Sequence, residues 1–281
     1  MKKALFGALL TIATTAVQAS TVKDLESSTV VKGTIVLAKD GTVQTAVVDD
    51  ADKYGQPIAD LVRKAALQWR FQPVLRDGEP VLAKASMHVR VVLKRMPDGS
   101  YNARVKGATF GDNDPNDTGT LHNTGDNKRI PPRYPEAAIR ARVQGTVYLS
   151  LHVDRSGRVT EAVAEQVNLA NIGPDGVLKQ YREVLAKAAL AAAHNWRYAI
   201  PTTGKLARQD SWTARVPVNF GLRGVGIPEY DRGVWQTYVP GPYTPAPWID
   251  RPDMNGADAL ADGDVQTDGA GPTLLAAPNR G

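Results

Sequence analysis

The side chains best suited to catalysis or metal binding are the four histidines, and their spacing supports neither role. None lies in the His-Glu-x-x-His pattern that places two imidazoles on one face of a helix. His152 falls on the polar face of a predicted strand, which favours solvent exposure over metal ligation. His194 closes a predicted helix, where a partly charged imidazole suits the helix dipole. We therefore predict no metal site from His88, His122, His152 and His194.

Other reactive groups are missing or are not arranged for a reaction. The chain has no cysteine, which excludes disulfides and thiol catalysis. It contains no Gly-x-Ser-x-Gly nucleophile elbow and no glycine-rich phosphate loop. Its carboxylates are numerous, but the sequence shows no pair that could work as acid and base. We therefore expect a protein that is not an enzyme, has no catalytic residue and binds no cofactor or small-molecule substrate.

One acidic stretch superficially resembles a calcium-binding loop that starts at Asp112. Such a loop needs Gly at its sixth position and Glu at its twelfth. Here these positions are Asp117 and Asn123, so a solvated linker is the better interpretation. The formal net charge of +5 is mild and its basic residues are scattered, which does not indicate nucleic-acid binding.

A set of short motifs occurs twice in the same order, which predicts two copies of one structural unit. Trp69 and Trp196 each end an amphipathic helix, so we expect them to anchor a core rather than stack on a ligand. The first copy contains Gly33-Thr-Ile-Val-Leu, Gly41-Thr-Val and Trp69-Arg-Phe, and the second contains Gly145-Thr-Val-Tyr-Leu, Gly157-Arg-Val and Trp196-Arg-Tyr.

Hydrophobic spacing predicts the order strand, strand, helix, strand in each copy. The predicted elements are two strands within 30–48, a helix at 57–69, a strand at 85–94, a short helix at 136–143, strands at 145–153 and 157–167, a helix at 178–195 and a closing strand at 211–220. We expect an α+β fold of two tandem small antiparallel sheets, each packed with one helix, plus a disordered linker and tail.

The N-terminal segment has the features of a signal peptide. Lys2 and Lys3 precede an apolar run that is shorter than the roughly 20 residues of a membrane span. Val17-Gln18-Ala19 fits a cleavage site before Ser20. We expect export to the periplasm by a cleaved signal, with an uncleaved inner-membrane anchor as the alternative.

The linker and the tail differ in composition from the two copies. The linker is too polar to bury, and the acidic end of the tail predicts disorder. The aromatic and proline-rich start of the tail either folds back over a sheet or recognises another envelope component. The predicted boundaries are 1–19 for the signal peptide, 22–96 for the degenerate first copy, 97–130 for the linker, 131–222 for the second copy and 223–281 for the tail.

The second copy resembles the C-terminal domain of TonB, the periplasmic energy-transducing protein of Gram-negative bacteria. The similarity rests on an ordered set of motifs, and residues 22–96 look like a degenerate copy without the Tyr-Pro entry. The motifs are Tyr134-Pro135 with Ala138, Gly145-Thr-Val, Gly157-Arg-Val, the Ala-rich helix ending in Trp196-Arg-Tyr, and Arg215-Val-Pro-Val-Asn-Phe220.

The resemblance implies a binding function. Domains of this family dock a short receptor peptide as an added strand, and an exposed sheet edge has the unpaired backbone groups for this. Pro217 lacks an N–H, which indicates that the closing strand has at least one unpaired side. The implied partner is an envelope protein, such as a peptide of an outer-membrane receptor. The implied docking residues are Ala214, Arg215, Val216, Pro217, Val218, Asn219 and Phe220.

The chain departs from a full energy transducer, which needs an uncleaved anchor and a long proline-rich spacer. We therefore expect a periplasmic TonB-like adaptor. The alternatives are a diverged transducer held by an uncleaved N-terminal segment, and an exported hydrolase or carbohydrate-binding protein. Because each small unit has an open sheet edge, the two copies are also expected to pair as an internal pseudo-dimer.

Overall fold

The computed structural model describes residues 25–111, 118–123, 129–222, 235–249, 257–259 and 265–276. The predicted signal peptide at 1–19 and the acidic positions 112–117 lie outside these described residues. Within the described ranges, no helix is both long enough and apolar enough to cross a membrane.

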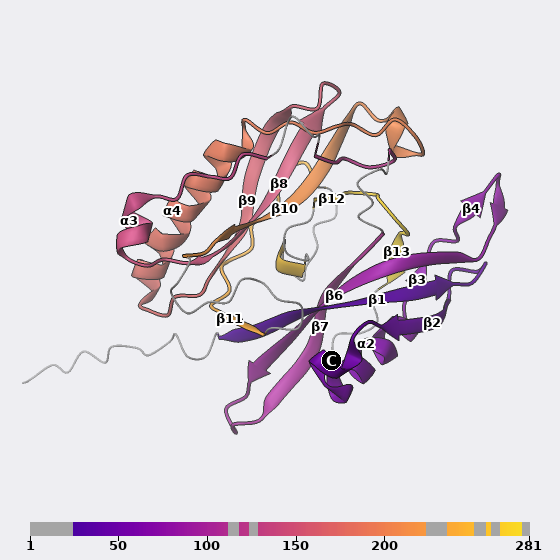
Figure 1. The fold of residues 1–281 in the computed structure, drawn as a ribbon, viewed down its shortest axis with the longest axis horizontal. Helices are drawn as coiled ribbons and strands as arrows, with labels where there is room; N and C mark the ends of the chain where they lie inside the picture. The colour runs from indigo at the N-terminus through magenta and orange to yellow at the C-terminus, as the bar shows by residue number, and fades with distance from the viewer. Residues whose placement is uncertain are drawn as a thin grey trace, which may run out of the picture.

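The first unit is an antiparallel sheet with a helix on one face (Figure 1). Its elements are β1 (Glu26–Leu37), β2 (Val43–Val48), α1 (Ala51–Tyr54), α2 (Gln56–Leu67), β3 (Arg70–Phe71), β4 (Leu75–Arg76), β5 (Glu79–Pro80), β6 (Ala83–Arg95) and β7 (Tyr101–Phe110). The sheet has the strand order β11-β1-β6-β7, where β11 (Gln236–Tyr238) comes from the tail, and β2 also pairs with β1. Alternate residues of β1 and β6 face α2 and form one core.

The second unit has the same construction. Its elements are α3 (Glu136–Arg140), β8 (Gly145–Asp154), β9 (Val159–Leu169), α4 (Asp175–Ala193), η1 (Leu206–Arg208) and β10 (Ser211–Phe220). The strand order is β12-β10-β8-β9, where β12 (Gln266–Thr267) is again a segment of the tail. The predicted fold class, small antiparallel sheets each packed with a helix, is confirmed.

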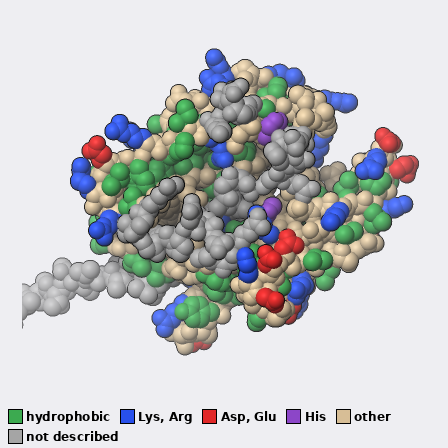
Figure 2. Space-filling view, in the orientation of Figure 1, with side chains coloured by type: hydrophobic (Ala, Val, Ile, Leu, Met, Phe, Trp, Pro, Cys, Tyr) green, Lys and Arg blue, Asp and Glu red, His purple; other side chains and the backbone are tan. Residues whose placement is uncertain are grey.

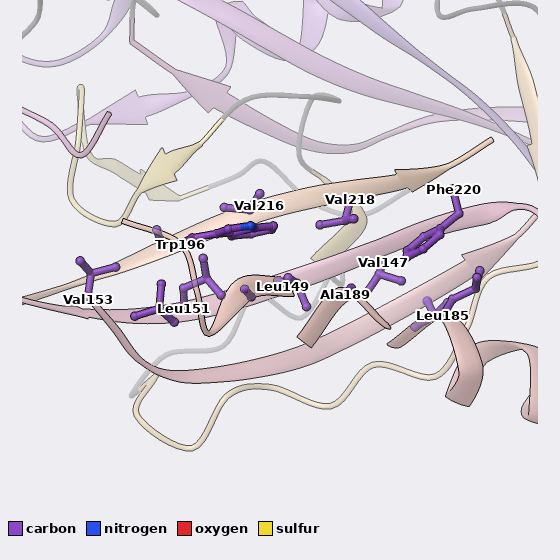
Figure 3. Close-up of a cluster of buried hydrophobic side chains, with 14 of the residues drawn as sticks. Val147, Leu149, Leu151, Val153, Leu185, Ala189, Trp196, Val216, Val218 and Phe220 are labelled. Carbon is purple, nitrogen blue, oxygen red and sulfur yellow. The ribbon is translucent and has the colours of Figure 1, made fainter. Parts of the chain in front are cut away.

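The core of the second unit lies between its sheet and α4 (Figure 3). Side chains on a strand alternate between the two faces, so Val147, Leu149 and Leu151 all point toward the helix. Leu185 and Ala189 of α4 meet them from the other side. Fully burying each large aliphatic side chain contributes about 1.5–3 kcal/mol, which makes this layer the main source of the unit's stability.

Both units contain the same local contacts at their hairpin turns. The amide of Phe71 donates to the Gly41 carbonyl at 2.9 Å, and the amide of Tyr198 donates to the Gly157 carbonyl at 2.9 Å. Gly41 has a φ of 81° and Gly157 a φ of 75°, and in each a Cβ would lie about 2 Å from a backbone oxygen. Both positions therefore require glycine, because φ is positive and because a Cβ would clash with a backbone oxygen.

Part of the predicted linker is strand β7, which pairs with β6 over most of its length. The predicted start of the linker is Pro97-Asp98-Gly99. In the structure this is a hairpin turn, in which the Met96 amide donates to the Ser100 carbonyl at 2.8 Å. The polar residues that follow form a strand because β6 supplies a partner, which composition alone does not reveal.

The tail supplies short elements to both units, whereas the sequence predicted disorder for its acidic end at 250–281. Within the described ranges, β11 pairs with β1, β12 pairs with β10, and β13 (Leu274–Ala276) pairs with β3. The short helix η2 (Ala257–Ala259) lies between the two sheets, against β7, β8 and β9 (Figure 1). The described parts of the tail thus cover the faces of the sheets that carry no helix.

The four tail aromatics pack back on the two units, as in one of the two alternatives that the sequence left open. Trp235 packs on the core of the first unit, and Tyr243 packs with Tyr148 of β8. Trp248 lies 5.9 Å from the His152 ring. Tyr238 is also buried.

Candidate peptide-docking edge

The predicted docking strand is β10, which pairs along its whole length with β8. The register runs from Ser211 opposite Asp154 to Phe220 opposite Gly145. Trp212, Ala214, Val216, Val218 and Phe220 alternate and are buried in the core. These even-numbered residues fix the strand in place, and the alternate residues lie on the opposite face of the sheet.

The other side of β10 is the edge at which a further strand can be added, and we call residues 214–220 the docking edge. The amide of Asp268 donates to the Thr213 carbonyl at 2.9 Å, so the odd-numbered backbone groups point toward this side. Pro217 belongs to the same set and has no N–H to donate. The missing N–H would point away from β8, so Pro217 leaves the hydrogen bonds between β10 and β8 intact.

The chain's own tail occupies one end of the docking edge. β12 pairs antiparallel with β10, with Ala214 opposite Thr267 and Arg215 opposite Gln266. The register covers two residues of the edge, on a strand that the sequence predicted to have at least one unpaired side. Residues 265–268 are therefore functional candidates that the sequence analysis missed.

A weak signal for this segment was present in the sequence. Val265 and Thr267 are strand-favouring residues that alternate with the polar Gln266 and Asp268. Gly269, with a φ of 78°, ends the segment. The run is too short, and its surroundings too acidic and glycine-rich, to be separated from disordered sequence by composition.

Arg215 gives the docking edge its charge. Its Nε lies 3.8 Å from Oδ1 of Asp268. Burial raises the pKa of the Asp268 carboxyl, the Arg215 charge opposes this, and Glu165 adds to the increase. The Arg215 guanidinium can donate a hydrogen bond to an acceptor side chain of an added strand, whether that acceptor is a carboxylate or a neutral group.

Asn219 and Phe220 close the edge at its other end. Thr146 Oγ1 donates to Asn219 Oδ1 at 2.6 Å, which ties the edge to β8. The Phe220 ring lies 5.3 Å from the Tyr134 ring in an edge-on arrangement. The Tyr134 hydroxyl donates to the Val143 carbonyl, and burial raises the pKa of Tyr134 to about 12. Tyr134 therefore keeps its proton and acts as a structural donor at neutral pH.

The remaining motif residues support the fold and lie away from the docking edge. Pro135 precedes the first turn of α3 in an extended conformation. A Cβ at Gly145 would lie 2.2 Å from the Asn168 carbonyl oxygen. Trp196 is buried and donates from Nε1 to the Ile130 carbonyl at 2.9 Å. Trp69 is buried against Phe71 and Phe110. The two tryptophans are core anchors, as predicted.

A second feature missed from the sequence is a buried polar group between the two units, which we call the interunit cluster. Its members are Glu26, Lys106, Asn168, Tyr238 and Asp258. Lys106 Nζ donates to Glu26 Oε2 at 2.9 Å and to Asp258 Oδ2 at 2.5 Å. Asn168 Nδ2 donates to the same Asp258 oxygen at 2.7 Å. The cluster joins β1 and β7 of the first unit, β9 of the second unit and η2 of the tail.

The charges of the interunit cluster depend on one another. Burial alone would raise the pKa of Glu26, but the Lys106 charge and hydrogen bonds from Lys106 and Tyr238 lower it below its usual value. Burial and the two neighbouring carboxylates raise the pKa of Tyr238. No local sequence pattern could predict this cluster, because its five members come from five separate elements, β1, β7, β9, β11 and η2.

The histidines do not gather into a site. His152 Nδ1 lies 2.9 Å from Thr160 Oγ1, and His122 forms a backbone bridge with Ala199. Among the residues that the structure describes, no group of three His, Cys, Asp or Glu side chains could hold a metal ion.

Lys and Arg side chains are spread over many parts of the face shown in Figure 2 rather than gathered over one element.

Comparison with known proteins gives matches to the second unit. The family model described as the Gram-negative bacterial TonB protein C-terminal matches residues 130–166. Two curated relatives, each named Protein TonB and from two strains of Xanthomonas campestris pv. campestris, are 36% identical over 92 residues. The alignments cover 33% of this chain and 35% of each relative, so the chain spans about a third of the relatives it matches. No solved structure matches. The second unit of this chain is thus similar to the C-terminal domain of TonB proteins.

Proposed function

We propose that this chain is a periplasmic adaptor whose second unit binds an extended peptide of an envelope protein by strand addition along β10. The observation that carries the proposal is β12, an extended segment that pairs with β10 on the side away from β8. An edge that accepts one segment offers the same backbone donors and acceptors to another.

The docking edge can provide both affinity and selectivity. Backbone hydrogen bonds to the odd-numbered residues attract any extended chain, and Arg215 distinguishes chains by the side chain that lies at the position of Asp268. Pro217 interrupts the ladder of donors, so an added strand gains fewer hydrogen bonds beyond Arg215. We expect modest affinity, because few residues pair and the peptide becomes ordered on binding.

The family match supports a partner in the cell envelope. The relatives are named Protein TonB, and the family model that matches residues 130–166 of this chain describes the C-terminal part of TonB proteins. An outer-membrane receptor peptide is the partner that we favour, with export through the segment at 1–19. The proposed role is binding and not catalysis, since the family is one of envelope energy transduction and binding.

We further propose that residues 22–96 are a degenerate copy of the second unit, and that the two copies form an internal pseudo-dimer. The matching contacts of Gly41 and Gly157 support a common origin. The interunit cluster supports a fixed arrangement, because Asp258 accepts hydrogen bonds from Lys106 of one unit and Asn168 of the other. In this arrangement the tail, rather than a shared strand edge, holds the copies together.

The test of strand addition is a backbone N-methyl scan. Random dodecapeptides displayed on phage are selected on the full chain, and the best binder is synthesised with one N-methyl group at a time. Strand addition predicts that affinity falls about tenfold or more at every second residue and changes little at the residues between, because only alternate amides face β10.

The control is the variant Arg215→Glu, which keeps the backbone of β10 and reverses its charge. Selected peptides that bind at the docking edge should bind this variant with altered affinity. A uniform response to N-methylation, together with unchanged binding to Arg215→Glu, would show that the peptides bind elsewhere and would refute strand addition at β10.

A diverged energy transducer is the second candidate, and the similarity to proteins named TonB favours it. It differs from the adaptor in one physical respect. Transmission of force requires a chain that stays attached to the inner membrane, and this would need an uncleaved segment at 1–19.

A further inference from the structure

The tail segment at 265–268 lies on the docking edge as a bound peptide would. We propose that this segment is an internal ligand of the docking edge, and that the partner peptide which displaces it carries the same pattern: an apolar residue, any residue, Ser or Thr, and a hydrogen-bond acceptor. This inference rests on the proposed function and specifies the chemistry of the ligand.

The backbone of the segment has the geometry of strand addition. Asp268 donates its amide to the Thr213 carbonyl at 2.9 Å, and the antiparallel register places Gln266 opposite Arg215. Amides two residues apart point the same way, so Gln266 and Asp268 both face β10 while Thr267 faces away. The partner peptide is therefore expected to run antiparallel to β10.

Two side chains of the segment enter the core of the second unit. Val265 packs against the core cluster, and Thr267 is 2% exposed. The Thr267 Oγ1 accepts a hydrogen bond from the Leu121 amide at 3.0 Å in a buried position. A hydroxyl at this position satisfies an amide that a purely apolar side chain would leave without a partner, which selects Ser or Thr.

The other two side chains lie on the face that carries Arg215. Gln266 is directly opposite Arg215, and Asp268 Oδ1 lies 3.8 Å from Arg215 Nε. The 3.8 Å separation is longer than a hydrogen bond, and Arg215 Nε is buried without a hydrogen-bond partner among the described residues, so a neutral acceptor that reaches it can replace the carboxylate. A lysine there would place a like charge beside Arg215 and should be rejected.

The segment can dissociate from the docking edge while it stays covalently attached to the rest of the chain. Its ladder with β10 spans two residues, and Gly269 ends the strand in a turn closed by the Ala270 amide on the Thr267 carbonyl at 3.0 Å. The preceding tail helix is fixed by Asp258, which is fully buried in the interunit cluster. A tethered segment competes at a millimolar effective concentration, so a partner peptide must exceed this to take its place.

The experiment uses a fluorescein-labelled peptide with the sequence of residues 263–271, Gly-Asp-Val-Gln-Thr-Asp-Gly-Ala-Gly, and the full chain. Fluorescence anisotropy measures binding to the wild type and to two variants that loosen the tail, Thr267→Pro and Asp268→Lys. We expect at least tenfold tighter binding to Thr267→Pro than to the wild type, because the edge is vacated. Asp268→Lys keeps the tail backbone intact and should give a smaller gain, which preserves the test if the proline variant does not fold.

The chemistry of the ligand is tested in the peptide. Replacing its Thr by Val should weaken binding to the loosened chain about tenfold, and replacing its Asp by Lys should do the same. Replacing its Asp by Asn should change affinity by less than about threefold. Equal binding of all four peptides would overturn the proposed pattern.

The two proposals fail in different ways. If neither folded variant binds the labelled peptide, the internal ligand is refuted. Strand addition still stands in that case when the phage-selected peptide shows its alternating response to N-methylation. If the selected peptide shows no alternation but the tail peptide binds Thr267→Pro, the edge serves only the chain's own tail, and the proposed function is refuted.

Discussion

Replacing Lys106 by Met tests whether the interunit cluster stabilises the arrangement of the two units. Lys106 is 6% exposed and lies between the carboxylates of Glu26 and Asp258. Among the described residues, removing it leaves Asp258, which is fully buried, with the Asn168 amide at 2.7 Å and the Tyr238 hydroxyl at 3.5 Å as donors. Breaking a buried ion pair by removing one partner typically costs about 3–5 kcal/mol, and we expect a loss of this size.

Urea denaturation followed by far-ultraviolet circular dichroism measures the loss. With a denaturant slope of about 2–3 kcal/mol/M, a loss of about 3–5 kcal/mol lowers the midpoint by roughly 1–2 M. The matched control is Arg104→Met, which removes a second cation 3.2 Å from Glu26 whose side chain is 41% exposed. Exposed pairs contribute about 0–1 kcal/mol, so this control should barely move the midpoint.

A double variant shows whether the stability lost in Lys106→Met comes from the unpaired charge of Asp258 or from the lost contact itself. Adding Asp258→Asn to Lys106→Met removes the negative charge that has lost its partner, so the double variant should be more stable than Lys106→Met alone. The reasoning would be refuted if Lys106→Met cost less than about 1 kcal/mol, or if Asp258→Asn made it less stable still.

Three further predictions concern acidity, the hairpin turn and the N-terminal segment. Because the folded pKa of Glu26 lies below its usual value of 4.5, its stabilising contribution is present above that pH and is lost as pH falls through the lowered pKa; urea midpoints between pH 6 and pH 3 should fall less steeply in Lys106→Met than in the wild type. Gly157→Ala should destabilise by more than about 1 kcal/mol, since φ is 75° and the new Cβ would meet the Tyr198 carbonyl at 2.1 Å, whereas Gly176→Ala, with no atom within 4 Å, should be neutral or stabilising in the same thermal melts. Intact mass of the native chain from periplasmic and membrane fractions should show a soluble chain that begins at Ser20; a membrane-held chain that retains residues 1–19 would support the transducer instead.

The local pattern of the sequence was sufficient to predict the regular core of each unit. The closing strand predicted at 211–220 is β10 with the same bounds. Alternation from Val147 to Val153 predicted β8, because a strand with one buried face shows its register directly in the residue types. Gly157 and Trp196 marked a turn and a core anchor, since a positive φ and a large buried ring each restrict the residue type.

Tertiary structure alone decided which segments cover the edges and faces of those sheets. β12 has two residues and β11 has three, which is too short for a periodic signal. Asp258 looked like one of many tail carboxylates, and only the approach of Lys106 and Asn168 from two different units makes its burial favourable. Strand β10 was therefore determined by the sequence, and its pairing with the chain's own tail was determined by contacts between residues far apart in the chain.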